Sequence, residues 1–187
     1  MFEQVKERIH GRIAMSADDA AVLERLVIEA GNADTCEIGT LYGGSAILAA
    51  LAKQKNSLKG LVYAIDPLTG YYGGLDTTVG GKPGRAELES NLQEFDVHAA
   101  VVIVAAKSHP WPVPCNRRFG LVFVDGDHST GAVYQDFVNA SEVTDTILFH
   151  DYHAEEVRLG IVKALENSSD WMLEVLGEKM AVMRRMP

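Results

Sequence analysis

Apolar residues along this chain fall into two patterns: short continuous runs, and longer stretches in which they recur every three or four positions. Continuous runs predict strands buried on both faces, as in a parallel sheet, and they lie at 36–38, 60–67, 99–106, 119–128 and 145–152. The helical spacing predicts helices at 2–13, 18–30, 43–54, 84–95, 129–142 and 155–167. Strands and helices therefore alternate, which is typical of an α/β fold with a doubly wound parallel sheet.

The C-terminal stretch 171–185 breaks this alternation. It splits at Gly177 into two short apolar runs, which predict an antiparallel hairpin closing a seven-stranded, mostly parallel sheet. A length of 187 residues suits one domain, so we expect 1–187 to fold as a single unit. The helices within 1–31 are expected to cover the sheet or a ligand cleft, with Ser16 as the N-cap of the second helix.

Composition and charge exclude several classes of function. The net charge is −9, from 17 basic and 26 acidic residues, which argues against nucleic acid or an anionic membrane as the main partner. Two cysteines, Cys36 and Cys115, are too few for a disulfide scaffold. The N-terminal segment has no signal-peptide pattern and no run of 18 apolar residues exists, so we expect a cytoplasmic protein.

The first predicted strand leads into a glycine-bearing turn with the sequence DTCEIGTLYGGS, 34–45. Gly39 and Gly43 would let the backbone approach a ligand closely, and a helix beginning near Ser45 would present free N–H groups. Glu37 could accept hydrogen bonds from ligand hydroxyls or an amine. The spacing matches neither the P-loop nor the dinucleotide fingerprint, and an ordinary strand-to-helix turn is the alternative.

Other polar residues lie at the ends of the later strands. Asp66 ends the second strand, where a carboxylate can accept from both hydroxyls of a ribose, although a turn or capping role is equally open. Ser108 lies just past the third strand. The glycine-rich stretch 68–84, which contains Tyr71 and Tyr72, is either a lid over a ligand or a mobile insertion.

A second polar cluster follows the fourth and fifth strands, in VDGDHS, 124–129, and FHDYH, 149–153. The carboxyl ends of adjacent parallel strands should bring these carboxylates and imidazoles together. Mixed oxygen and nitrogen donors suit Mg²⁺, Mn²⁺ or Fe²⁺ more than a structural zinc. The alternatives are a purely hydrogen-bonded polar site, a helix-capping role for Asp127, and a solvated surface position for His153.

Together these motifs resemble class I S-adenosylmethionine-dependent methyltransferases of the catechol and macrocin O-methyltransferase-like branches. EIGTLYGGSA, 37–46, is similar to their motif I, and VDGDHS with HDY, 150–152, is similar to their FIDGDHSY…FHDY pattern. The resemblance implies a Rossmann-like fold and an S-adenosylmethionine site. It assigns cofactor binding to strand-end and loop residues, namely Glu37, Gly39, Thr40, Gly43, Ser45, Asp66, Ser108 and Asp125.

The resemblance also implies a catalytic arrangement. Asp125 and Asp151 match the family's Mg²⁺ ligands, with His150 as a candidate third ligand. His128 stands where the catechol branch has a Lys general base, and a histidine can serve there. Tyr152 departs from the family's Asn, which puts the metal site in question. Members of the resembling family usually carry a Lys-Pro-Gly-Gly turn before the fifth strand, whereas this sequence has SEVTDT, 141–146.

The expected function is therefore methyl transfer from S-adenosylmethionine to a small hydroxylated acceptor, with Asp125 and His128 as catalytic residues and with or without a divalent metal such as Mg²⁺. A nicotinamide-dependent oxidoreductase on a similar sheet is one alternative. A non-catalytic S-adenosylmethionine-binding protein is another, although such a protein has no need of the second polar cluster. The acceptor's identity is not encoded in any recognisable motif, and a homodimer is left open.

Overall fold

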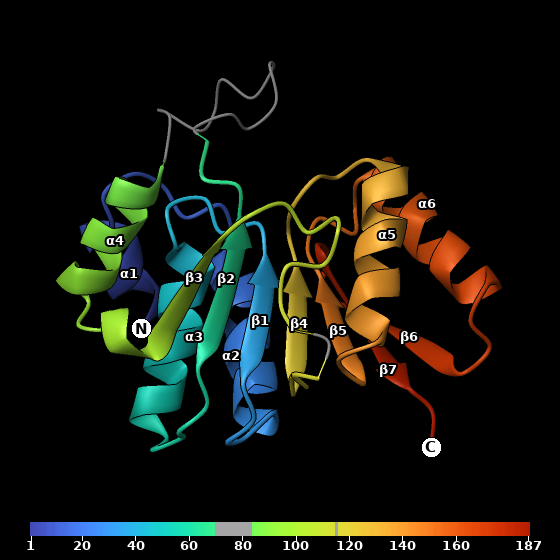
Figure 1. The fold of residues 1–187 in the computed structure, drawn as a ribbon, viewed down its shortest axis with the longest axis horizontal. Helices are drawn as coiled ribbons and strands as arrows, with labels where there is room; N and C mark the ends of the chain where they lie inside the picture. Colours follow the sequence, from blue (N-terminus) through green and yellow to red (C-terminus); the bar gives the residue numbers. More distant parts are fainter. Residues whose placement is uncertain (70–83, 115) are drawn as a thin grey trace.

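The computed structural model describes residues 1–69, 84–114 and 116–187, and its centre is one seven-stranded sheet (Figure 1). The strand order is β3-β2-β1-β4-β5-β7-β6. The first five strands in the chain pair in parallel, while β7 pairs antiparallel with both β5 and β6. The predicted Rossmann-like, doubly wound sheet with a C-terminal antiparallel hairpin is confirmed.

The elements follow the predicted alternation closely. The strands are β1 Thr35–Ile38, β2 Val62–Asp66, β3 Val101–Ala105, β4 Leu121–Val124, β5 Thr146–Phe149, β6 Trp171–Leu176 and β7 Met180–Arg185. The helices are α1 Phe2–Arg8, α2 Ala17–Glu29, α3 Gly44–Lys55, α4 Arg85–Glu94, α5 Thr130–Ser141 and α6 Glu155–Glu166, with a short 3₁₀ helix, η2, at His98–Ala100.

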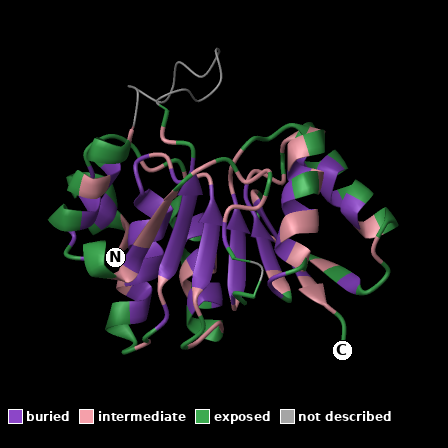
Figure 2. Cartoon of the chain, viewed as in Figure 1, coloured by how far each residue is buried: buried purple, intermediate pink, exposed green. Residues whose placement is uncertain are grey.

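Each face of the sheet packs against its own hydrophobic cluster. Apolar residues of α1, α2, α3 and α4 cover one face, and those of α5 and α6 cover the other (Figure 1). Strands β1, β2 and β4 are buried at every position, which explains their continuous apolar runs (Figure 2). The parallel strands therefore all direct their carboxyl ends to one edge of the sheet, where the polar strand-end residues lie.

The segment between β3 and β4 contains no helix among its described residues, 106–114 and 116–120. It crosses the sheet from β3 toward β4 (Figure 1). Val113 and Phe119 in this segment join the cluster formed with α5 and α6, and the Phe119 ring meets Tyr63 of β2 edge-on at 5.4 Å between centroids. Apolar side chains of this segment thus add to the packing on the face that α5 and α6 cover.

The N-terminal region differs from its prediction. Helix α1 ends at Arg8 rather than near residue 13, and Gly11 has φ +108°. The chain then continues without regular secondary structure to Ser16, which caps α2 as predicted through a capping box with Asp19. Within the described parts of the chain, no helix is long and apolar enough to span a bilayer. Tyr71, Tyr72 and Cys115 lie outside the described residues.

Candidate functional site

The glycine-bearing loop connects β1 to α3 at the carboxyl edge of the sheet. Gly39 has φ +85°, and a Cβ added there would lie 2.2 Å from the Asp125 carbonyl oxygen. Asp125 N–H in turn donates to the Ile38 carbonyl at 2.8 Å. Gly43, with φ +89°, is the N-cap of α3 and carries no side chain to cap it. The loop therefore needs glycine at Gly39 because the chain after β4 lies directly against it.

Glu37 points from β1 into the protein rather than into solvent. Its carboxylate accepts hydrogen bonds from the hydroxyls of Thr40 and Ser45, so it ties both ends of the loop to the strand. Burial raises its pKa to about 8, although these two hydrogen bonds oppose the shift. The Glu37 side chain is thus an internal support of the loop in this conformation.

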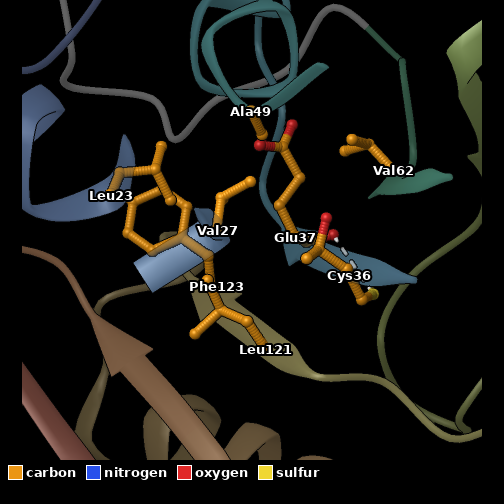
Figure 3. Close-up of a pocket in the computed structure, with 9 residues that line it drawn as sticks. Leu23, Val27, Cys36, Glu37, Ala49, Val62, Leu121 and Phe123 are labelled. Carbon is orange, nitrogen blue, oxygen red and sulfur yellow. Dashed lines mark hydrogen bonds between the residues drawn. The ribbon is translucent and has the colours of Figure 1, made fainter. Parts of the chain in front are cut away.

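A small cavity of about 10 Å³ lies beneath Glu37, between β1 and helices α2 and α3 (Figure 3). It is lined largely by apolar side chains, including Val27 and Phe123, and Figure 3 shows Glu37 extending toward Ala49. This volume is at the lower limit for one water molecule. The cavity is therefore too small for a nucleoside and belongs to the packing of the loop.

Asp66 reaches the same loop from the neighbouring strand. Its Oδ2 accepts from the backbone N–H groups of Thr40 at 3.0 Å and Leu41 at 3.2 Å, and its Oδ1 accepts from Leu68 N–H at 2.8 Å. Glu37 and Asp66 therefore both contact Thr40, one through its hydroxyl and one through its backbone. The structure brings these predicted residues into one connected group.

Ser108 lies apart from this group, on the side of α5. Its carbonyl accepts from the Asn139 amide at 2.9 Å, and its hydroxyl lies 3.4 Å from the nearer His109 ring nitrogen. The His109 Nε2 is 3.5 Å from Asp136, a buried acid of α5 whose pKa burial raises to about 6. Sequence patterns contain no signal for Asp136, because an acid on a helix is usually solvated.

Three predicted polar residues converge beyond β4 and β5. Asp125, His128 and Asp151 each place one donor atom within 4.8 Å of the other two. His128 Nε2 lies 3.5 Å from Asp125 Oδ1 and 3.6 Å from Asp151 Oδ2, and the His128 side chain is 45% exposed. These two carboxylates and one imidazole, called here the three-donor group, have an open, solvent-facing side and form a donor set that fits a divalent cation.

His150, the candidate third ligand from the sequence, lies next to this group, whose third member is His128. The His150 side chain is 1% exposed, and its Nδ1 lies 3.0 Å from Asp125 Oδ1 and 3.3 Å from Asp151 Oδ2. It contacts the carboxylates from the protein interior, whereas His128 contacts them from the solvent side. His153 is half exposed, with Nδ1 3.7 Å from Asp151 Oδ1.

The carboxylates shift the pKa values of the imidazoles beside them. The hydrogen bond to Asp125 raises the pKa of His128, although partial burial opposes it. Burial lowers the pKa of His150, yet its hydrogen bonds to Asp125 and Asp151 outweigh this and raise it to about 10. Burial alone would raise the pKa of Asp151. Hydrogen bonding to His150 outweighs this and lowers the pKa below its ordinary value.

The remaining residue of the second motif, Asp127, has a structural role in the described contacts. Its Oδ1 accepts from the Ser129 backbone N–H at 2.9 Å, directly before α5 begins. This hydrogen bond lowers the pKa of Asp127. The alternative of a helix-start role for Asp127, rather than a ligand role, fits this contact.

The fold and the loop define the class of protein. A sheet with this strand order, and a motif I loop at the carboxyl end of β1, are those of class I S-adenosylmethionine-dependent methyltransferases. A family model described as a methyltransferase domain matches residues 36–152, from β1 through the residue after Asp151. The chain belongs to this methyltransferase family, as its sequence resemblance predicted, and not to the nicotinamide oxidoreductases. No curated protein sequence matches the chain significantly.

Solved structures with the same fold come from several kinds of methyltransferase. The O-methyltransferase NovP aligns with a TM-score of 0.78 at 13% identity, covering 99% of this chain and 88% of NovP. TomG from Streptomyces achromogenes, an O-methyltransferase of tomaymycin synthesis solved with S-adenosylmethionine, gives 0.67 at 17% identity, covering 100% and 89%. A Pyrococcus horikoshii protein named for RNA methylation gives 0.67 at 12% identity, covering 100% and 97%. The fold is therefore shared across acceptor classes.

Proposed function

We propose that this protein transfers the methyl group of S-adenosylmethionine to a hydroxyl of a small acceptor molecule. The supporting observation is that the motif I loop and the polar cluster share a backbone contact, since Gly39 lies against Asp125. A donor held by the loop would therefore have its sulfonium end beside Asp125, His128 and Asp151. Transfer from a sulfonium is an in-line displacement, so alignment of donor and acceptor supplies most of the catalysis.

In this proposal the donor is held by the residues assigned from the sequence. Gly39, Thr40, Gly43 and Ser45 present the loop backbone and the start of α3, and Glu37 keeps that loop in place. Asp66 would exchange part of its hydrogen bonding with the loop for the ribose hydroxyls of the donor. Ser108 follows the end of β3, a position that in this family meets the adenine, and its present contacts are to Asn139 and His109.

The acceptor hydroxyl is proposed to lie at the open side of the three-donor group. Asp125 and Asp151 would hold a divalent cation there, and a bound cation would lower the pKa of the acceptor hydroxyl. His128 is the exposed imidazole of the group and is positioned to accept the proton of that hydroxyl. Asp125 and Asp151 orient the His128 ring through its Nε2.

His128 also has a second candidate role, as third metal ligand, because it belongs to the three-donor group. The His128→Ala variant separates the two roles. If His128 is the base, turnover at pH 7 should fall about 100-fold, recover at high pH, and leave the Mn²⁺ and S-adenosylhomocysteine dissociation constants unchanged. If His128 is a ligand, turnover and Mn²⁺ affinity should both fall. Unchanged turnover and unchanged Mn²⁺ affinity would reject both roles.

A small-molecule acceptor is favoured over RNA by charge. The chain carries nine more acidic than basic residues, and binding to a phosphate backbone relies on clustered Lys and Arg. A radiolabelled methyl-transfer assay should compare a panel of phenols and other hydroxylated small molecules with structured RNA, each with Mg²⁺ or with a chelator. Labelling of RNA alone would overturn the proposed acceptor. Binding of S-adenosylhomocysteine without transfer to any acceptor would favour a non-catalytic binding protein.

A further inference from the structure

Asp19 connects helix α2, near the N-terminus, to the polar cluster that follows β4 and β5. It occupies the third position of α2, where an acid completes the capping box: its Oδ2 accepts from Ser16 N–H at 2.9 Å and from Ser16 Oγ at 2.7 Å. Acids at this position usually face solvent, but Asp19 is only 5% exposed. Its burial indicates that the carboxylate has a second partner inside the protein.

That second partner is His150. Asp19 Oδ2 lies 3.6 Å from His150 Nε2, a buried nitrogen with no hydrogen bond to any described residue. The other ring nitrogen, Nδ1, is the one that contacts Asp125 and Asp151. The ring therefore lies between an acid of α2 on one side and the two carboxylates of the candidate acceptor site on the other.

The aromatic contact made by His150 does not by itself set the orientation of the ring. Phe123 of β4 meets the ring edge-on, with centroids 6.2 Å apart and planes at 70°. Such a contact restricts the ring but does not distinguish its two flipped orientations, in which Nδ1 exchanges places with Cδ2 and Nε2 with Cε1, because the two have a similar shape. An acid facing Nε2 does distinguish them, since it favours the orientation in which an N–H rather than a C–H faces it, and in that orientation Nδ1–H can donate to the Asp125 and Asp151 carboxylates.

We propose that Asp19 is a positioning residue for the acceptor site, fixing the His150 ring so that its Nδ1 holds Asp125 and Asp151 at the spacing that their shared ligand requires. This inference rests on the proposed function, because it assigns Asp125 and Asp151 a common ligand. It adds Asp19 to the acceptor site, although this residue lies before the region that the family model matches, which begins at residue 36. It also gives the N-terminal region a part in the chemistry beyond covering the sheet.

The capping role and the positioning role of Asp19 can be separated by two matched variants. Asp19→Asn keeps the size of the side chain and an oxygen that can accept from Ser16, but presents a neutral amide to His150. Ser16→Ala removes the hydroxyl from the capping box and leaves the Asp19 carboxylate facing His150. Both variants should lower stability by similar amounts, whereas the positioning role predicts that only Asp19→Asn affects His150 and the carboxylates.

Two measurements on the whole 187-residue chain test this. In the metal-free protein, the imidazole nitrogen resonances of His150, assigned with a His150→Gln variant, should shift in Asp19→Asn and stay at the wild-type positions in Ser16→Ala. In titrations with Mn²⁺, Asp19→Asn should bind the ion about tenfold more weakly, the lower end of the range for outer-shell partners of metal ligands. In the methyl-transfer assay its kcat should fall by about the same factor. The dissociation constant of S-adenosylhomocysteine should change less than twofold.

The outcomes separate this inference from the proposed function. Unshifted His150 resonances in Asp19→Asn, or equal losses in Asp19→Asn and Ser16→Ala, would overturn the positioning role. Wild-type protein that binds no Mn²⁺ would instead overturn the metal-assisted part of the proposed function. In that case two readouts still test the positioning role. The His150 resonances should shift, and kcat should fall, in Asp19→Asn but not in Ser16→Ala.

Discussion

The motif I loop and the polar cluster beyond β4 and β5 lie against each other but are built in opposite ways. In the loop, Glu37 and Asp66 are buried, and their contacts run to neighbouring hydroxyls and backbone N–H groups. In the cluster, Asp125 and Asp151 are only partly buried and contact ionisable imidazoles. The loop is therefore held by groups that keep one arrangement, whereas the cluster retains an open side and groups that can exchange protons or ligands.

This difference indicates where each region tolerates change. A loop whose shape depends on close backbone contacts should fail when a single atom is added. A cluster with an exposed side should keep its fold when a ligand is removed and lose only its chemistry. Variants in the two regions should therefore separate donor binding from methyl transfer.

The largest effect is expected at Gly39. In Gly39→Ala the new Cβ would lie 2.2 Å from the Asp125 carbonyl oxygen, in backbone with φ +85°, so the loop must move or the strand ends must separate. We expect a loss of about 3 kcal/mol in the free energy of unfolding, from overpacking and left-handed strain together. S-adenosylhomocysteine binding should fall below detection in calorimetry.

Gly131→Ala is the matched control for this variant. Gly131 lies in the first turn of α5, and an added Cβ meets nothing within 4 Å. This substitution should leave ligand binding unchanged and raise the free energy of unfolding by about 0.5–1 kcal/mol, because Ala is the better helix former. If Gly39→Ala behaved like Gly131→Ala, the close contact between loop and cluster would be refuted.

A smaller effect is expected from the buried carboxyl group of Glu37. Its pKa is about 8 in the folded protein, against an ordinary value of 4.5. Between these values the folded state holds a proton that the unfolded state has released, so this group makes stability fall as pH rises from 4.5 to 8. Between pH 5 and 6.5 the fall amounts to about 2 kcal/mol at most.

Glu37→Gln keeps the shape of the side chain and removes its titration. Urea unfolding of wild type and variant at several pH values should show a stability difference that moves in favour of the variant as pH rises through this window. The difference between the two proteins cancels the contributions of His150 and Asp136, which titrate in both. A constant difference from pH 5 to 8 would mean that the Glu37 carboxylate is charged in the folded protein.

The fold could be predicted from the sequence because the burial of each strand and helix leaves a pattern of apolar residues within that element. Continuous apolar runs arise where both faces of a strand are covered, so β1, β2 and β4 could be recognised from their residues alone. The convergence of Asp125 with Asp151 followed as well, since β4 and β5 are adjacent parallel strands. The end of α1 was missed although Gly11, which turns the chain there, stands in the sequence.

The contacts of the site could not be predicted in the same way. The helical pattern of α2 shows which residues are apolar, but it does not say which buried residue of the sheet the first turn will meet. Asp19 was therefore recognisable only as a helix-start residue, and its contact with His150 arises only once α2 is docked. Likewise, sequence spacing offered Asp125 and Asp151 two candidate imidazoles and could not say that His128 lies outside and His150 inside.

The smallest effect is expected at His153, which tests how far the cluster extends. Its side chain is 53% exposed, and its Nδ1 lies 3.7 Å from Asp151 Oδ1, beyond hydrogen-bond distance. An exposed pair at this separation contributes about 0.5 kcal/mol or less. His153→Ala should therefore change kcat by less than about twofold in the methyl-transfer assay, in contrast to the large loss expected for His128→Ala. A loss at His153 equal to that at His128 would extend the cluster to the start of α6, and the open side of the three-donor group would then have to face that helix.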